Sequence, residues 1–414
     1  MPESEGAKRR TAEELGDYVS EVGGLLLRYA CPAYRVEALI RVVADLEGHD
    51  ADAFALPTGL FVTITPREGR HAPVHRMVRA REWRIDLQRL LFVDAIFNEV
   101  AEGKRTIEAA RAALEGLEQE PAGYAALTRW IAVAVTSASA AWLFGGLPLD
   151  GALAAVVGLV VHALGRLLGS HPQARLLHDF VGALAAALVT GLFGYALPLA
   201  SRDAVLLGGM IVLFPGMTLT TGLAEVAHKN LVAGAARLME ALVTFLSMVF
   251  GIALAIATAK ALELAAPDPP LRVDFDLPRR AVAVLGTSLG LGIAFNVPRR
   301  LLWTALVSGA TSYGVSLFAA RYLPSHVGAF IAATTLCAVA NLLARHTHRP
   351  AQLFHLPGMM LLVPGSLGFL GLGDFLRGTY TSGTEKLVSM LLVAGGLVMG
   401  VLVANVVVPP RKLL

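Results

Sequence analysis

From residue 124 onward the chain is a succession of long apolar segments separated by short polar ones. A helix needs about 20 mostly apolar residues to cross a bilayer. We identify ten segments that approach this length, at 124–145, 149–168, 177–197, 203–220, 231–259, 280–295, 301–320, 326–343, 353–372 and 384–407. The pattern predicts an α-helical polytopic membrane protein with about ten transmembrane helices.

The first 123 residues follow a different pattern. Apolar side chains recur every three or four residues at Leu15, Val19, Val22 and Leu26, which predicts an amphipathic helix. Further helices are expected at 34–46, 87–101 and 106–117, with strands at 60–65 and 74–78. We therefore divide the chain into a small N-terminal α/β domain at 1–123 and two membrane portions at 124–260 and 279–414.

Composition supports this division. Of all residues 55% are hydrophobic and 16% are charged, against about 25% charged in soluble domains. Residues 1–123 hold 16 Lys/Arg and 21 Asp/Glu, whereas the other 291 residues hold 19 Lys/Arg and 11 Asp/Glu. The sequence has no basic patch with interleaved aromatic residues, so we expect no nucleic-acid partner. The two cysteines have no metal-ligand spacing around them, so we expect no metal or cofactor.

The two membrane portions resemble each other at an offset of 149 residues. Placed without gaps, 209–255 and 358–404 share 13 identities in 47 positions. Each portion holds five predicted spans, and because five is odd the second copy must enter the membrane from the opposite side. A 5+5 inverted repeat is characteristic of secondary transporters. An old duplication in a channel or a membrane enzyme is the alternative.

The orientation follows from what precedes the first span. The N-terminus has no apolar core after its charges, so it is not a signal peptide. We expect a multi-pass protein of the cell (inner) membrane with its N-terminal domain in the cytoplasm, although loop charges favour this only by nine to seven. Small-residue spacings such as Gly151 with Ala155 would allow a homo-oligomer or equally a close internal packing.

A Pro-Gly pair interrupts one apolar segment in each half. Proline removes a backbone donor and glycine tolerates unusual dihedral angles, so each pair should break its helix. The N-terminus of a half-helix carries partial positive charge and suits a carboxylate. The candidate substrate-binding residues around the two breaks are Pro215, Gly216, Thr218, Thr220, Pro364, Gly365 and Ser366. A plain proline kink is the alternative.

Charged residues within spans are the second group of candidates. Arg237 and Glu240 lie on one face of the fifth span, and Lys386 occupies the position of Arg237 in the second repeat. Arg237 and Lys386 could bind a substrate carboxylate, and Glu240 could take a coupling proton. An Arg237–Glu240 structural pair is the alternative. Asp179, at the start of the third span, is a second proton-coupling candidate, with a satisfied interfacial residue as its alternative.

Several motifs resemble a known family. Tyr34-Arg35-Val36-Glu37 with Pro57-Thr58-Gly59 is similar to the N-terminal domain of the threonine/serine exporter family, and 208–251 resembles its membrane core. The second half, with Val363-Pro364-Gly365, is similar to the C-terminal partner domain of that family, here fused to the first. Cys31-Pro32-Ala33 departs from the family pattern.

The resemblance implies efflux of threonine and serine, driven by exchange for protons. Dicarboxylate export is the alternative substrate class, and a channel is a less favoured alternative. The sequence contains no nucleophile elbow, phosphate loop or zinc motif, so we do not expect an enzyme. The expected partners are a small amino acid, protons and the lipid bilayer.

Overall fold

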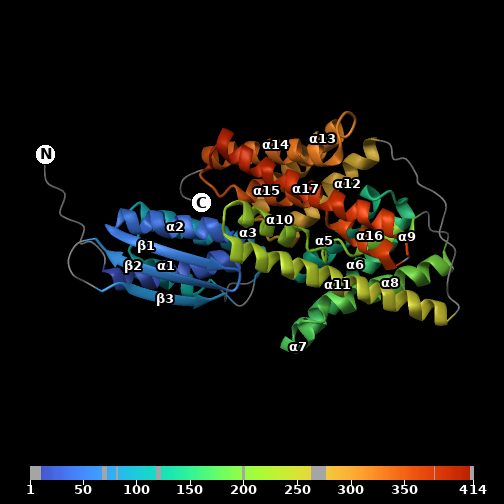
Figure 1. Cartoon of the computed structure of the whole chain (residues 1–414), viewed down its shortest axis with the longest axis horizontal. Helices are drawn as coiled ribbons and strands as arrows, with labels where there is room; N and C mark the ends of the chain where they lie inside the picture. The colour runs from blue at the N-terminus through green and yellow to red at the C-terminus, as the bar shows by residue number, and fades with distance from the viewer. Residues whose placement is uncertain are drawn as a thin grey trace.

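The computed structural model describes residues 11–67, 72–80, 83–117, 123–197, 201–262, 277–376 and 378–410. The molecule is elongated, with a small αβ unit at one end and a long bundle of helices filling the rest (Figure 1). We call residues 11–117 the N-terminal unit. Its helices are α1 (Ala12–Arg28), α2 (Ala33–Leu46), α3 (Leu87–Ala101) and α4 (Ile107–Glu115).

A three-stranded antiparallel sheet lies in the N-terminal unit beside these helices. Its order is β1 (His49–Leu56), β2 (Gly59–Pro66) and β3 (Val74–Arg79). The four predicted helices and the two predicted strands are confirmed. The strand β1 was not predicted, because Asp50 and Asp52 alternate with alanines in it and leave no β-branched run. The predicted face of α1 is buried, with Leu15, Val19 and Leu26 at most 1% exposed.

Among the described residues, eight helical segments are long and apolar enough to cross a membrane. They are α5 (Ala126–Leu143), α6 (Pro148–Gly169), α8 (His178–Ala196), α11 (Leu231–Ala261), Arg299–Ala319, α14 (Ser325–Thr347), Gln352–Phe375 and α17 (Tyr380–Val407). The fifth of these joins the short helix η1 (Arg299–Leu301) to α13 (Leu302–Ala319), and the four-residue α7 (Pro172–Arg175) stands between α6 and α8.

The prediction of ten spans is therefore not confirmed among the described residues. The expected span at 203–220 is divided into α9 (Arg202–Gly209) and α10 (Gly216–Ala227), and neither is long enough to cross a bilayer alone. The expected span at 280–295 forms α12 (Leu277–Ala294), whose two arginines and three glycines lower its mean hydropathy. Gln352–Phe375 is likewise divided, into α15 (Gln352–Leu362) and α16 (Gly365–Leu376).

Glycine brings the long helices close together in both halves. A Cβ on Gly251 of α11 would lie 2.5 Å from the carbonyl oxygen of Phe180 in α8, and one on Gly400 of α17 would lie 2.6 Å from that of Phe330 in α14. Gly251 and Gly400 are 149 residues apart. Small residues let helix backbones touch in a membrane, where lipid gives no hydrophobic drive for association. The two halves therefore use one packing device at equivalent positions.

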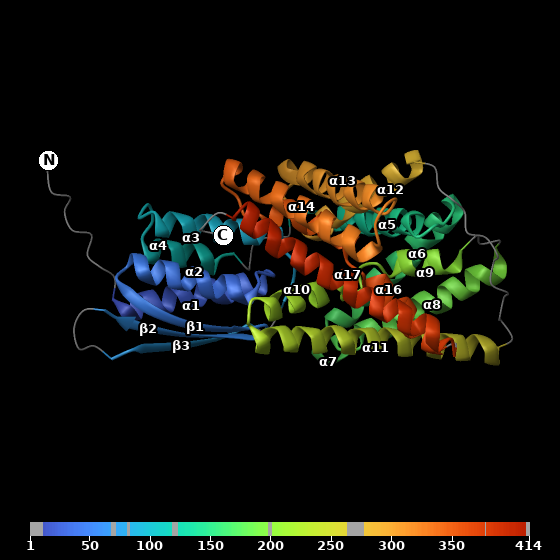
Figure 2. The same cartoon turned by 45° about the horizontal axis from the view of Figure 1, so that its top comes forward.

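The N-terminal unit packs against one end of the bundle, where α11 begins and α17 ends (Figure 2). The Leu87 N–H donates to the Phe295 carbonyl over 2.8 Å, and the Asn296 amide donates to Asp86 over 3.1 Å. Buried side chains of the unit belong to one continuous cluster with Leu291 and Phe354 of the bundle. The end of the bundle is thus part of the core of the N-terminal unit.

Candidate functional site

The two predicted helix breaks are confirmed. Pro215 and Gly216 stand at the N-terminus of α10, after a turn that ends α9, and Pro364 and Gly365 stand at the N-terminus of α16. Each proline immediately precedes a new helix, where its missing donor and its fixed φ are tolerated.

The two breaks also meet each other in the middle of the bundle. A Cβ on Gly216 would lie 2.0 Å from Cγ1 of Val363 and 3.7 Å from Cα of Gly365. A Cβ on Gly365 would lie 3.0 Å from Cβ of Phe214. Only glycine allows this approach. The N-termini of α10 and α16, each with partial positive charge, therefore start from one place.

Hydroxyl groups follow both breaks, as the sequence indicates. Thr218 and Thr220 are buried, and the Thr220 hydroxyl donates to the Gly216 carbonyl over 2.9 Å. Ser366 is half-buried. A polar group next to a helix N-terminus can share in binding an anion that the free backbone N–H groups attract.

Arg237 forms a buried ion pair, but with a residue other than the one considered from the sequence. Its Nε lies 3.2 Å from Oε1 of Glu225 in α10, and the two side chains are 1% and 0% exposed. Glu240 is on the exposed surface of α11. The structure thus separates Glu240 from the Arg237 pair, since α10 rather than the next turn of α11 supplies the carboxylate.

Lys386 forms the corresponding ion pair in the second half. Its Nζ lies 2.6 Å from Oδ2 of Asp374, which also accepts from the Ser382 hydroxyl over 2.6 Å. Asp374 stands 149 residues after Glu225, as Lys386 does after Arg237. Sequence reasoning missed both acids, although the ungapped comparison of the repeats places glutamate over aspartate at that position. The second pair is more open, with 34% of the Lys386 side chain exposed.

The N-terminal unit covers the first ion pair. The Ala33 N–H, at the start of α2, donates to Oε1 of Glu225 over 3.0 Å, so the carboxylate caps that helix as well as pairing with Arg237. The guanidinium carbon of Arg237 lies 5.5 Å from the centre of the Trp83 ring, a cation–π distance. The Asn230 amide donates to Glu37 over 3.0 Å.

The start of α2 is tightly enclosed at this contact. The ring of Tyr34 stacks on that of His228 with 3.7 Å between centroids. Burial raises the pKa of the Tyr34 phenol to about 12 and that of the Cys31 thiol to about 12, because both would have to ionise away from water. Both groups therefore remain protonated at neutral pH.

A cavity of about 100 Å³ lies between the N-terminal unit and the bundle. It is bounded by α2, by the segment before α3, and by helices α10, α14, α15 and α17, so both membrane halves contribute to it. Thr220 lines it, one turn from Gly216 at the helix break. Its other polar lining residues are Tyr34, Arg35, Trp83, Thr221, Asn341, Gln352, His355 and Asn405.

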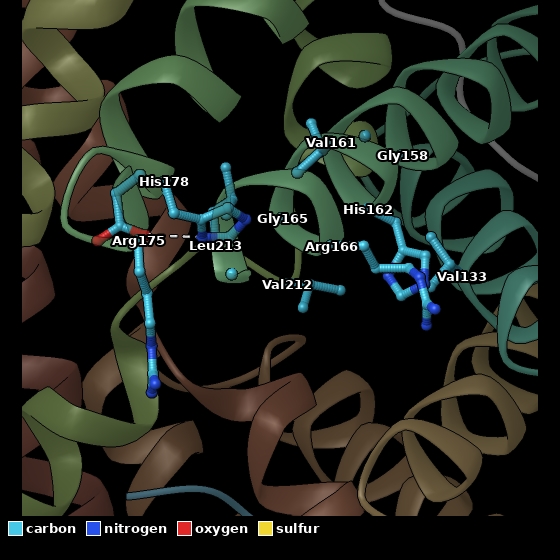
Figure 3. A pocket seen from close by; sticks show the side chains of 13 residues that line it. Val133, Gly158, Val161, His162, Gly165, Arg166, Arg175, His178, Val212 and Leu213 are labelled. Atoms are coloured by element: carbon cyan, nitrogen blue, oxygen red, sulfur yellow. Dashed lines mark ion pairs between the residues drawn. The ribbon is translucent and has the colours of Figure 1, made fainter. Parts of the chain in front are cut away.

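Asp179 lines a separate, larger cleft of about 460 Å³ between α6, α8 and the turn after α9. Figure 3 shows His162 and Arg166 together on one wall and His178 across Gly165 from them. Nδ1 of His178 lies 3.4 Å from Oδ1 of Asp179, and the Thr244 hydroxyl donates to Oδ2 over 3.3 Å. The cleft reaches Val212 and Leu213, just before the first helix break.

These features lie in several places in the bundle and are not gathered in one site. The Pro-Gly residues and the threonines lie around the contact between the two helix breaks, at Gly216 and Gly365, which we call the helix crossing. Arg237 and Lys386 lie toward opposite ends of the bundle. No cluster of three or more His, Cys, Asp or Glu that could hold a metal ion occurs in the described parts of the chain.

Comparison with known families gives matches over most of the sequence. A family model described as "Putative threonine/serine exporter" matches residues 17–259, and one described as "Threonine/Serine exporter, ThrE" matches residues 280–407. No solved structure matches the chain significantly.

Named proteins are similar at modest identity. A "Probable threonine/serine exporter" of Mycobacterium tuberculosis is 28% identical over 84% of this chain and 67% of its own length. The "Threonine/serine exporter" of Corynebacterium glutamicum is 24% identical over 79% of this chain and 69% of its own length. The "Pheromone-regulated membrane protein 10" of Saccharomyces cerevisiae is 25% identical over 56% of this chain and 30% of its own length. The chain thus spans about two thirds of the bacterial relatives and less of the yeast protein.

Proposed function

Because the chain belongs to the threonine/serine exporter family, we propose that it exports threonine and serine across the cell membrane by exchange for protons. The observation that carries this proposal is the contact between the two Pro-Gly helix breaks, one from each half. Broken helices at membrane depth are typical of the substrate sites of secondary transporters.

We also propose that 124–260 and 279–414 are five-segment inverted repeats behind a cytoplasmic domain at 1–123. The equivalent ion pairs at an offset of 149 residues support the repeat. So do the directions of α11 and α17, since one begins and the other ends beside the N-terminal unit. Counting each broken helix pair as one segment gives five in each half.

In this scheme the substrate carboxylate binds at the N-termini of α10 and α16, where two helix dipoles present free N–H groups. Pro215 and Pro364 create these ends, and Gly216 and Gly365 let the carboxylate approach the backbone. Thr218, Thr220 and Ser366 hydrogen-bond the hydroxyl and ammonium groups of the substrate.

We assign the charged candidates roles away from the two helix breaks. Arg237 and Lys386 bind the carboxylate on its way in and out, when their acidic partners release them. Asp179 carries the coupling proton in its open cleft. Glu240 assists it from α11, one helical turn before Thr244, which contacts Asp179.

The test is transport by the full-length protein in proteoliposomes. We expect saturable uptake of labelled threonine and serine, with counterflow, that increases with an imposed pH gradient. Asp179→Asn should abolish the response to the gradient while leaving counterflow, and Glu240→Gln should weaken it. Glu385→Gln, on the exposed face of α17, is the matched control.

Three outcomes would contradict the proposal in different ways. Flux of succinate without threonine would overturn the substrate. Flux that never saturates would indicate a channel. Threonine flux with the same pH response in both acidic variants would remove Asp179 and Glu240 from the coupling mechanism.

A further inference from the structure

The small cavity under the N-terminal unit holds an uncommon buried group. Gln352, in the first turn of α15, is 3% exposed, and both its amide nitrogen and its amide oxygen are buried without a hydrogen-bond partner. Buried polar groups are nearly always hydrogen-bonded, since an unsatisfied one keeps the full cost of its desolvation. An amide with a free donor and a free acceptor on a cavity wall is a binding group for a polar ligand.

A positive charge faces the same cavity from the N-terminal unit. Arg35, in the first turn of α2, lines it and acts electrostatically on His355, which lines it from α15. Within the described part of the chain we find no ion pair or hydrogen bond for the side chain of Arg35, whose backbone N–H donates to the Pro32 carbonyl. Arginine has five donors in a planar fork that suits a carboxylate. The guanidinium is therefore available to an anionic group in the cavity.

The remaining lining is largely apolar, with a few uncharged polar side chains. Asn341 and Asn405 come from α14 and α17 of the second half, and Thr221 comes from α10 of the first. The Asn341 amide already donates to Asn405 and to the Val408 carbonyl. The cavity has space for roughly three water molecules at about 30 Å³ each. The cavity therefore admits only a small solute.

We propose that this cavity is a binding site for a small hydroxylated amino acid on the N-terminal side of the helix crossing. Arg35 binds the carboxylate of the ligand, and the Gln352 amide binds its hydroxyl or ammonium group. The N-terminal unit thus contributes a ligand-binding residue and closes the site. This inference rests on the proposed export function and adds the substrate contact nearest the N-terminal unit.

One consequence is that binding and docking are linked. Arg35 is held in place by its neighbours in α2, which dock through Ala33 to Glu225 and through Tyr34 to His228. A ligand that contacts both Arg35 and Gln352 bridges the unit and the bundle. Ligand binding must then favour docking by the same factor as docking favours binding.

The experiment measures binding of L-threonine to the purified full-length protein in detergent by calorimetry. We compare wild type with Gln352→Met and Arg35→Gln. Loss of a hydrogen bond to a charged ligand should raise the Kd for threonine about tenfold or more in each variant. The matched controls are Gln173→Met in α7 and Arg79→Gln on β3, both at exposed positions, and they should leave the Kd unchanged.

Two further measurements separate a binding role from a structural one. Gln352→Met removes an unsatisfied amide and keeps its length, so the ligand-free variant should melt at the same temperature as wild type or higher. Threonine methyl ester, which lacks the carboxylate, should bind wild type weakly and should lose nothing further in Arg35→Gln.

The inference is overturned if both variants bind threonine within twofold of wild type while wild type transports it, and the proposed function then stands. Binding of succinate alone, dependent on Arg35, would overturn the assigned ligand class. If wild type neither binds nor transports threonine, the proposed function itself fails, and the inference fails with it.

Discussion

The buried Arg237–Glu225 pair allows a quantitative test of how the N-terminal unit is attached. In Arg237→Met the Glu225 carboxylate stays in the interior and keeps the hydrogen bond from the Ala33 N–H. Removing one partner of a buried ion pair typically costs about 3–5 kcal/mol, because the other charge is left without compensation. At about 1.4 kcal/mol per tenfold change, the folded and docked state would lose roughly 150-fold to 5,000-fold in population.

Two assays report this loss. Denaturant titration of the detergent-solubilised protein gives the free energy of unfolding, and hydrogen exchange gives the opening of the first turn of α2, whose Ala33 amide is bound to Glu225. The double variant Arg237→Met with Glu225→Leu should recover most of the stability, since apolar residues replace buried ion pairs at little cost. Lys386→Met is the internal comparison. With Lys386 a third exposed, its loss should be on the order of 1 kcal/mol.

The reasoning is refuted by additivity. If the free energy of unfolding of the double variant falls by the sum of the two single decreases, the two charges do not interact energetically. The 3.2 Å distance between Arg237 and Glu225 would then contribute nothing to stability. An equal loss in Lys386→Met would show that burial by the N-terminal unit does not distinguish the two pairs.

Three further predictions concern the helix crossing and the N-terminal unit. Gly216→Ala forces a Cβ against Val363, so it should reduce stability by about 1–3 kcal/mol and abolish threonine flux. Gly373 has open space around it, so Gly373→Ala should change neither quantity in the same melting and flux assays. In a Cys337→Ala background, Cys31 should not be alkylated by a maleimide at pH 8 until the protein is denatured. The reason is that burial raises the pKa of its thiol to about 12 and keeps it protonated. Labelling of the folded protein would contradict this prediction. In the folded state the pKa values of Cys31 and Tyr34 are raised from 9.0 and 10.0 to about 12, so their contribution to stability is complete below pH 9 and is lost as the pH rises toward 12. Denaturant titrations at several pH values should therefore show the free energy of unfolding falling above pH 9. The fall should be smaller in Cys31→Ala than in wild type.

Much of the secondary structure was predictable because it depends on local periodicity. The helix at 87–101 was predicted with the boundaries the structure gives, since its apolar positions and its flanking Asp86 and Gly103 are local signals. The helix breaks at Pro215 and Pro364 agree with the local effect of proline on its own backbone. That effect is not sufficient, because Pro357-Gly358 lies inside α15 without ending the helix. The strand β1 carries no such signal and forms only against β2.

The partners of the charged residues were not predictable in this way. Spacing on α11 places Arg237 beside Glu240, but the pair forms with Glu225 from α10, and a contact between helices depends on how they cross. The presence of Arg35 and Gln352 on one cavity likewise depends on the docking of the N-terminal unit, which brings together residues more than 300 positions apart. A stricter use of the repeat would have found the acids, because the matching Glu225 and Asp374 stand twelve residues before Arg237 and Lys386.

The one-sided position of the N-terminal unit has a consequence for the resting state. Lys386 lies about 28 Å along α17 from Asn405, which faces the unit, so the contacts of the unit fall at one end only. In the function proposed above, the two repeats exchange conformations, and the two resulting states would have equal energies if nothing outside the repeats contacted them. The hydrogen bonds from Ala33 and Asn230, at about 1 kcal/mol each, already skew that balance by more than tenfold. On that proposal, the unliganded protein should rest with the end beside the N-terminal unit closed, and the apparent affinity for substrate should be lower from that side than from the other.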